Sequence, residues 1–205
     1  MKERPILFSG EMVKAILKGC KSQTRRVVKG IALEWLWLDM FTPEYVALPG
    51  NYFSLYGYTG DRLWVKETWA AVWPDEDPVP LEQCNIEYKA DTGDLYPGSW
   101  PAEEARGNPE APKWRSSRFM PKWVARIWLE ITSVRVERLQ SITEDDTFAE
   151  GIVTGKPYTY GEGVECYRAL WNKLNARRGY PWESNPWVWV IEFQRLKIKE
   201  VQDDP

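Results

Sequence analysis

The chain has 205 residues, which is enough for one domain with a sizeable core but hardly for two independent folds. It contains no histidine, so Ser–His and Cys–His nucleophile pairs, histidine-liganded zinc and histidine acid–base catalysis are all excluded. With 27 basic and 30 acidic residues the formal net charge is -3, which argues against a general binder of duplex DNA.

Composition also bears on location and on bound groups. No stretch approaches the run of about twenty apolar residues that a membrane-spanning helix needs, and the first residues lack the pattern of a secretory signal. We therefore expect a cytoplasmic globular protein with no membrane partner. The three cysteines are far apart and form neither a metal knuckle nor a disulfide framework, and no residue pattern indicates a metal or another cofactor.

The first 28 residues predict a strand, a helix and a second strand. The apolar run 6–8 is typical of a short strand, and Ser9 is a good N-cap for a helix whose apolar residues within 12–17 share one face. Gly19 is the natural end of that helix. The following stretch, 20–28, is a polar loop that enters a short strand, which is a favourable place for a site.

Two segments in the middle of the chain look like insertions into a single domain that spans 1–205. Residues 30–58 are aromatic but aperiodic, so we expect an irregular excursion there. Residues 62–69 follow as one strand. The stretch 74–121, rich in Pro, Gly, Trp and acidic residues, predicts a long insertion around one strand at 85–90.

The strongest strand signal covers 126–139. Its apolar positions alternate up to Ile131 and continue from Val134 in the opposite phase, and a bulge near Thr132–Ser133 would reconcile the two phases. The last strand, 187–193, is apolar on nearly both faces, so we expect it at the centre of a sheet.

Two helices are predicted between these strands. Thr143 with Asp146 three residues later is typical of a helix start, and Gly151 ends that short helix. A second helix is expected over 163–175, where it would bury Val164, Tyr167, Leu170, Trp171 and Leu174. Short strands with a few small helices indicate an α+β fold, a curved sheet or small β-barrel flanked by helices.

The polar stretch after the first helix carries the best candidate chemistry. Lys21 and Thr24 are three residues apart, with Arg25 and Arg26 adjacent. A threonine hydroxyl needs a base to become a nucleophile, and in a chain without histidine a lysine is the available candidate. The same cluster would also bind phosphate or another anion without any chemistry, or would be ordinary solvated basic surface, and spacing alone leaves all three possibilities open.

Other residues are weaker candidates. Glu150 comes at the end of the short helix that Gly151 terminates, where the helix dipole disfavours a negative charge, so it is either functional or simply an exposed glutamate. Trp64 and Lys66, together with the two arginines, are candidates for binding a nucleic acid or nucleoside, because indole rings stack on bases. Core packing is the alternative for the tryptophans, of which the chain has 13.

Taken in order, several motifs resemble an ASCH domain of the PUA-like superfamily. They are Ile6-Leu7-Phe8, Ile16-Leu17-x-Gly19-x-Lys21-Ser22-x-Thr24-x-Arg26, Gly60-Asp61-x-Leu63-x-Val65, Val134-x-Val136, Glu150 and Val188-x-Val190-Ile191-Glu192-Phe193. The resemblance covers about residues 5–29, 58–70 and 124–195, outside both insertions. The full length and the closing segment are similar to the larger members that phages and prophages often encode.

This resemblance implies a small β-barrel with flanking helices, carrying here a long Pro/Trp-rich insertion, around a cleft for RNA or a modified nucleoside. In one small bacterial member, an N(4)-acetylcytidine amidohydrolase, a lysine, a threonine and a glutamate form the proposed catalytic set. Carried over by motif, these are Lys21, Thr24 and Glu150. Thr24 would attack the amide carbonyl, Lys21 would act as its base and Glu150 would assist proton transfer.

Four functions therefore follow as hypotheses. The first is binding of RNA or a modified nucleoside in a cleft lined by Lys, Thr, Arg and Glu. The second is amidohydrolase activity on N(4)-acetylcytidine-type nucleosides, and the acidic net charge favours such a compact ligand over a long polyanion. A ribonuclease ranks below both. The fourth is a phage protein whose acidic insertion contacts a host protein. No pattern indicates an oligomeric state.

Overall fold

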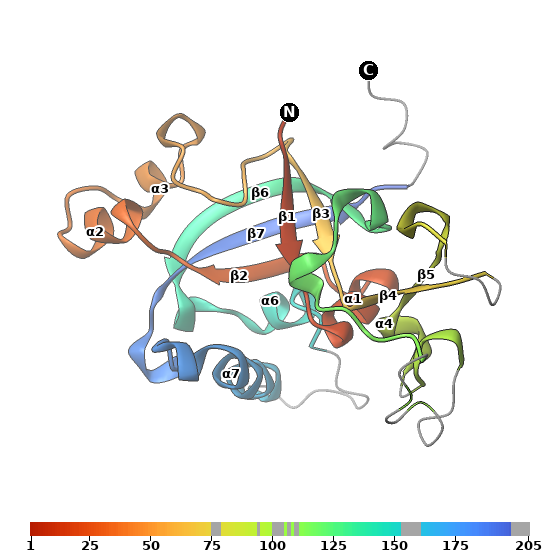
Figure 1. The fold of residues 1–205 in the computed structure, drawn as a ribbon. Coiled ribbons are helices and arrows are strands. Elements are labelled where there is room, and N and C mark those ends of the chain that lie inside the picture. The colour runs from red at the N-terminus through yellow and green to blue at the C-terminus, as the bar shows by residue number, and fades with distance from the viewer. Residues whose placement is uncertain are drawn as a thin grey trace.

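A computed structural model describes residues 1–74, 79–93, 95–99, 105, 108, 111–152 and 161–197. It has an α+β architecture built on one five-stranded sheet in the order β1-β3-β6-β7-β2, with a separate two-stranded ribbon, β4-β5 (Figure 1). The strands of the sheet are β1 (Glu3–Leu7), β3 (Arg62–Lys66), β6 (Trp128–Arg138), β7 (Trp187–Arg195) and β2 (Gln23–Val27). The β1–β3 pair is parallel and the other pairs are antiparallel.

The sheet curves, and β1 and β2 are its two ends (Figure 1). Within the described part of the chain no backbone ladder joins these two strands, so the pairing alone does not close a barrel. A side chain crosses between them instead, because Arg26 Nη2 donates to the Leu7 carbonyl over 2.8 Å.

Helix α1 (Gly10–Leu17) forms as its sequence predicts. The Ser9 hydroxyl accepts from the Met12 amide, Val13 and Ile16 are buried, and Gly19 follows the helix with φ of 74°. The chain then enters β2, which pairs along its length with β7, an interior strand beside the central β6. The polar loop and short strand expected over 20–28 are thus confirmed.

The predicted bulge in β6 is confirmed at Thr132. Ile131 pairs with Phe193 and Ser133 with Glu192, so one extra residue lies on β6 between two successive residues of β7. Beyond that point Val136 faces the same core as Ile131, although the two are an odd number of residues apart. The bulge therefore keeps apolar side chains of both halves of the strand on one face.

The expectation of an irregular 30–58 segment is wrong. It contains two short helices, α2 (Ile31–Trp37) and α3 (Pro43–Val46), which bury Ala32, Leu36 and Val46 in the main core. Helices of seven and four residues show too little periodicity for a sequence pattern to reveal them. Many of the segment's other apolar side chains are exposed.

The expected single strand at 62–69 is also wrong, because the chain turns at Glu67–Thr68 and starts a second strand. That strand, β4 (Trp69–Val72), pairs with β5 (Asn85–Tyr88). The strand predicted at 85–90 is thus confirmed up to Tyr88, and its last two residues belong to a helix instead. Helix α4 (Lys89–Thr92) follows. Within 74–121, positions 75–78, 94, 100–104, 106–107 and 109–110 lie outside the described residues.

Helices α6 (Glu144–Ala149) and α7 (Glu162–Asn175) lie together on one side of the sheet (Figure 1). The predicted start of α6 is confirmed, because Thr143 and Asp146 form a reciprocal capping box. In α7 Tyr167 and Trp171 are buried as expected, but Leu174 is exposed, since the chain ends that helix one residue later. In the described part of the chain no helix is long and apolar enough to cross a membrane.

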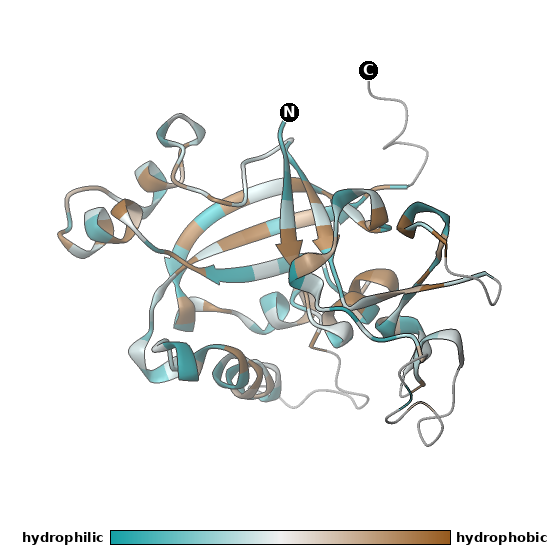
Figure 2. Ribbon diagram, viewed as in Figure 1, coloured by the Kyte–Doolittle hydropathy of each residue, from teal (hydrophilic) through white to brown (hydrophobic). Residues whose placement is uncertain are grey.

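Two cores lie on opposite faces of the sheet. The larger one joins β1, β3, α1, α2 and alternate residues of β6 and β7, and the smaller one joins β7 to α7. In Figure 2 the two central strands carry hydrophobic bands, whereas β2 is largely hydrophilic. A hydrophilic strand held between helices and a central strand is the feature that positions the site.

Gly151 provides a test of how closely α6 approaches the start of β2. It has φ of 84°, and a Cβ added there would lie 3.0 Å from the Ala15 Cβ and 3.1 Å from the Lys21 Cβ. Gly179 has φ of 87° with nothing within 4 Å of an added Cβ. Gly179→Ala should therefore lower the free energy of unfolding by about 1 kcal/mol, because of its left-handed backbone alone. Gly151→Ala should lower it by at least about 1 kcal/mol more, because its Cβ would also crowd Ala15 and Lys21.

The free energy of unfolding, measured by urea denaturation of both variants, checks this difference. Equal losses in the two variants would show that α6 does not press on Ala15 and Lys21.

Candidate functional site

The first three residues of β2 are polar yet almost fully enclosed. Gln23, Thr24 and Arg25 are 3%, 2% and 4% exposed. Because side chains alternate along a strand, Gln23 and Arg25 face α6 and α7, whereas Thr24, opposite Ile191, faces the main core. Polar side chains in such positions need partners, and these come from distant parts of the chain.

Lys21 lies directly before β2 and is also enclosed, and its side chain makes three hydrogen bonds. Its Nζ donates to the Gln23 carbonyl at 2.7 Å, to the Glu150 carbonyl at 2.8 Å and to Glu150 Oε2 at 2.7 Å. A lysine ammonium has three hydrogens, so all of its donors are used. The Lys21 side chain is fully enclosed, and the interpretation of this lysine as solvated basic surface is therefore wrong.

Glu150 comes to Lys21 from the C-terminal end of α6, and the two residues also form an isolated backbone bridge. Its second oxygen, Oε1, lies 3.5 Å from Arg25 Nη1 and 3.4 Å from the Tyr167 hydroxyl, which donates to it. The glutamate is 4% exposed, so the interpretation of it as an exposed surface residue is also wrong. Two cations balance the charge that the helix end disfavours.

Arg25 extends the cluster toward solvent. Its Nη2 lies 2.7 Å from Glu137 Oε1 and 3.0 Å from Asp146 Oδ2, and its Nη1 donates to the Gln23 side chain. Its own side chain has no exposed surface. At the rim of the cluster the half-exposed Arg135 joins Glu137, Asp146 and Glu192. The name Lys21–Glu150 cluster hereafter covers Lys21, Gln23, Arg25, Glu137, Asp146, Glu150 and Tyr167.

Burial shifts the ionisation of several members of this cluster. Desolvation lowers the pKa of Lys21, the charge and hydrogen bond of Glu150 oppose that shift, and the positive charges of the two arginines add to it. Burial, followed by the charge of Glu150, raises the pKa of Tyr167 well above its ordinary value. The tyrosine is thus a neutral donor, and Lys21 is a lysine from which a proton can be taken more easily than usual.

Thr24 lies one peptide away from the ammonium, since the carbonyl that Lys21 contacts belongs to the peptide joining Gln23 to Thr24. Among the described residues the Thr24 hydroxyl makes no hydrogen bond, although the residue is enclosed. The same part of the chain shows no direct bond between the Lys21 and Thr24 side chains. The structure therefore brings Lys21 and Glu150 into contact and leaves Thr24 beside them on the other face of the strand.

Arg26 lies over an aromatic ring at the same edge. Its guanidinium carbon is 5.1 Å from the centre of the Phe8 ring, and Lys21 Nζ is 5.6 Å from the same ring. Arg26 Nη2 donates to the Leu7 carbonyl, but its Nε is buried without an acceptor, as is Nε of Arg25. Two charged donors in one small region of the described chain thus lack a partner, which is unusual in a folded protein.

Trp64 and Lys66, the other candidate binding residues, lie elsewhere. Both are on the face of β3 that points away from the main core, and Lys66 Nζ is 5.3 Å from the Trp64 ring. The same ammonium donates to the Arg118 carbonyl at 2.6 Å. Over the residues that the structure describes, neither side chain bonds to the Lys21–Glu150 cluster.

Sequence reasoning missed Glu137, Asp146 and Tyr167 as members of the cluster. The sequence pattern assigned structural roles to Asp146 and Tyr167, as a capping residue and as a buried residue of α7. Glu137 alternates with apolar residues in β6 and carries no signal of its own. The charge of Arg25 was the available clue, because a buried arginine in an edge strand requires carboxylates from its neighbours. Within the described ranges no group of three His, Cys, Asp or Glu residues fits a metal ion.

Comparison with known proteins adds little to this geometry. No protein-family model and no curated protein matches the chain. Among solved structures, a high-resolution crystal structure of an ASCH domain from Lactobacillus crispatus JV V101 matches with a TM-score of 0.41 and 12% sequence identity. The match covers 95% of this chain and 79% of that one. At these values the likeness carries no conclusion about function.

Asp146 gives the cluster a measurable dependence on pH. Desolvation opposes its ionisation, but hydrogen bonds from Thr143 and Gln23 and the charge of Arg25 outweigh it and lower the pKa to about 2 from 3.8. A lowered carboxyl pKa contributes stability above about pH 4, and this contribution is lost as pH falls toward 2. Asp146→Asn should therefore be less stable at pH 6 and lose less stability on acidification to pH 2.5 than the wild type.

Urea denaturation at both pH values measures this, with Asp145→Asn as the matched control in the same turn. Asp145 is exposed, so its variant should follow the wild-type profile. An Asp146→Asn profile parallel to that of the wild type would contradict the assignment of Asp146 to the buried network.

Proposed function

We propose that the chain is an ASCH-type, PUA-like domain that binds a modified nucleoside, free or within RNA, beside Lys21, Thr24 and Glu150. The observation that carries this proposal is the convergence of Lys21, from the polar motif, on Glu150, 129 residues further along the chain. These are the residues that the motif resemblance marks as functional. In this view the curved sheet is the partly open equivalent of the expected barrel.

Energetics support a role beyond stability. A buried ion pair gains little for folding, because the desolvation of two charges offsets their attraction, and apolar residues of similar volume often serve as well or better. The cluster buries three charged side chains, Lys21, Arg25 and Glu150, whereas most buried positions of the described chain hold apolar side chains. Such a costly arrangement with shifted pKa values is typical of a functional site.

The groups with unused hydrogen-bonding capacity indicate what would bind. The Thr24 hydroxyl can donate or accept, and the Arg26 guanidinium, which bonds the Leu7 carbonyl through Nη2, has further N–H donors for a carbonyl or phosphate oxygen. A base offers carbonyl and amide groups in one plane, and the flat guanidinium of Arg26 is suited to stacking on it. Arg25, whose charge already meets three carboxylates, would position Glu150 rather than touch the ligand.

Trp64 and Lys66 enter this proposal separately. They lie on the outer face of β3, away from the cluster, and would contact the backbone and bases of an RNA longer than one nucleotide. A free nucleoside would not reach them.

The second candidate function is deacylation of an N(4)-acetylcytidine-type nucleoside, and the lowered pKa of Lys21 favours it. Lys21 would first give a proton to Glu150 Oε2, 2.7 Å away, and then take the Thr24 hydroxyl proton as the oxygen attacks the acyl carbonyl. The bond from the carbonyl to the exocyclic nitrogen would break, that nitrogen would take the proton from Lys21, and water would hydrolyse the acyl-threonine ester.

A binding experiment tests the proposal. The wild type should bind N(4)-acetylcytidine, free or within a short RNA, and Thr24→Val and Arg26→Ala should each weaken binding about tenfold, because each removes a hydrogen-bonding or stacking group. Thr132→Val, at the exposed bulge of β6, is the matched control and should bind like the wild type. Calorimetric titration measures the affinities.

Mass spectrometry of the same mixtures separates the two candidates. Cytidine released by the wild type but not by Thr24→Val would establish the amidohydrolase. Binding without release would leave a binding module. Wild-type affinity in both variants would overturn the proposed site.

A further inference from the structure

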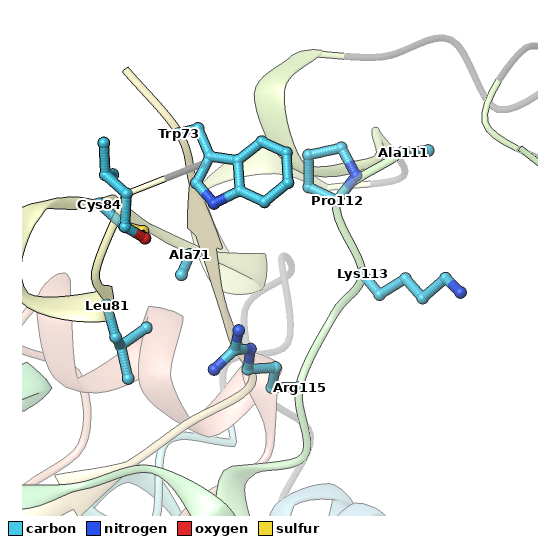
Figure 3. A pocket seen from close by; sticks show the side chains of 9 residues that line it. Ala71, Trp73, Leu81, Cys84, Ala111, Pro112, Lys113 and Arg115 are labelled. Atoms are coloured by element: carbon cyan, nitrogen blue, oxygen red, sulfur yellow. The ribbon is translucent and has the colours of Figure 1, made fainter. Parts of the chain in front are cut away.

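A pocket lies far from the Lys21–Glu150 cluster, between the β4–β5 ribbon and the segment 111–115. It has a volume of about 330 Å³, within the range of small-molecule sites. Figure 3 shows side chains from β4, from the turn before β5 and from the 111–115 segment around one space. The lining residues are Ala71, Trp73, Val79, Leu81, Cys84, Ala111, Pro112, Lys113 and Arg115.

The cavity arises because two backbone segments, β4 and 111–115, separate beyond a single bridge. Trp69 and Arg115 are joined by two backbone hydrogen bonds, of 3.3 and 2.7 Å, as a single antiparallel bridge. Beyond the bridge the two segments carry small side chains, Ala71 on one and Ala111 on the other, and their described residues pair no further. Short side chains on facing segments leave the space that larger ones would fill.

One wall of this pocket is aromatic. Trp69, Ala71 and Trp73 alternate along one face of the ribbon, and Trp69 is buried in a small core with Met120 and Val124. That core ends before Trp73, which is 46% exposed. Its indole lies beside the Pro112 ring at the top of the space in Figure 3. A large flat ring at the rim of a cavity is a surface on which another ring can stack.

The opposite wall is cationic. The Arg115 guanidinium points into the space, toward Ala71, whereas the Lys113 side chain points outward from the rim (Figure 3). The Arg115 guanidinium carbon is 5.1 Å from the Trp69 ring, which holds it in place. In the part of the chain that the structure describes, neither cation forms an ion pair, and no carboxylate lines the pocket.

From this geometry we infer a second ligand site, one for a nucleoside monophosphate or for one nucleotide of a single-stranded RNA. The base stacks on Trp73, the phosphate binds Arg115, and Lys113 adds charge at the rim. Arginine binds phosphate through two parallel hydrogen bonds, so its charge and shape suit this anion. The apolar floor formed by Ala71, Leu81 and Cys84 accommodates a base edge without specific hydrogen bonds, so the site tolerates different bases. This second site does not depend on the function proposed for the Lys21–Glu150 cluster.

Photolabelling with 8-azidoadenosine 5′-monophosphate tests the site by position. Trypsin releases residues 67–89, which include Trp73 and Cys84, as one peptide separate from the peptides of β2. We expect the label on 67–89, with excess cytidine 5′-monophosphate competing and cytidine or inorganic phosphate alone competing at least tenfold less well. Protection by cytidine 5′-monophosphate but not by an RNA oligonucleotide would identify the free nucleotide as the ligand, and protection by both would identify the RNA as well.

Three variants decide the contacts. Arg115→Ala, which removes the cation, and Ala71→Leu, which fills the cavity, should each reduce labelling and affinity about tenfold or more. Arg118→Ala removes an exposed cation three residues further on that does not line the pocket, and it should behave like the wild type. Circular dichroism establishes that each variant is folded.

Label on a β2 peptide alone would overturn this second site while supporting ligand binding near Thr24. Equal labelling of the wild type, Arg115→Ala and Ala71→Leu, or no labelling of 67–89 at millimolar nucleotide, would overturn it as well.

Discussion

The arrangement of this chain depends on keeping a lysine ammonium and a glutamate carboxylate together where water does not reach them. Lys21 Nζ has all three hydrogens engaged, two of them with Glu150. Moving either residue away would therefore leave the charge of the other buried and unpaired. This requirement fixes the end of α6 against the start of β2. It also explains the close approach of Gly151 to Ala15 and Lys21, since a side chain there would push the helix away.

The same pair organises the face of the sheet that carries α6 and α7. Arg25 reaches Glu150 from β2, and Tyr167 reaches it from α7, so two elements are oriented toward one carboxylate. From there the charges continue through Asp146 to the half-exposed Arg135 at the rim. Buried and solvent-exposed groups are thus linked in one network of ion pairs. A change of charge at Arg135 would therefore alter the electrostatic environment of Lys21 through Asp146, Arg25 and Glu150.

Part of this structure could be predicted from the sequence, and physical reasons separate that part from the rest. The bulge at Thr132 was predictable because an extra residue is the usual way for a strand to change the phase of its apolar positions and keep them on one face. The capping box of α6 and the end of α1 were predictable because they are local. The short helices α2 and α3 were not, because they bury only a few apolar side chains each. The motif residues Lys21, Thr24 and Glu150 could be named, but the enclosure of Arg25 depends on carboxylates more than a hundred residues away.

The most direct test of the central claim is a paired replacement of the two buried charges, Lys21→Met with Glu150→Gln. If the ion pair serves the ligand rather than the fold, the free energy of unfolding of the double variant should be at least about 1 kcal/mol higher than that of Lys21→Met alone, because no charge of the pair is left uncompensated. The Gln23 and Glu150 carbonyls lose their Lys21 donor in both variants, so that loss cancels in the comparison. The double variant should bind N(4)-acetylcytidine at least about tenfold more weakly than the wild type. A folded double variant that binds the nucleoside as tightly as the wild type would contradict a role of the ion pair in ligand binding.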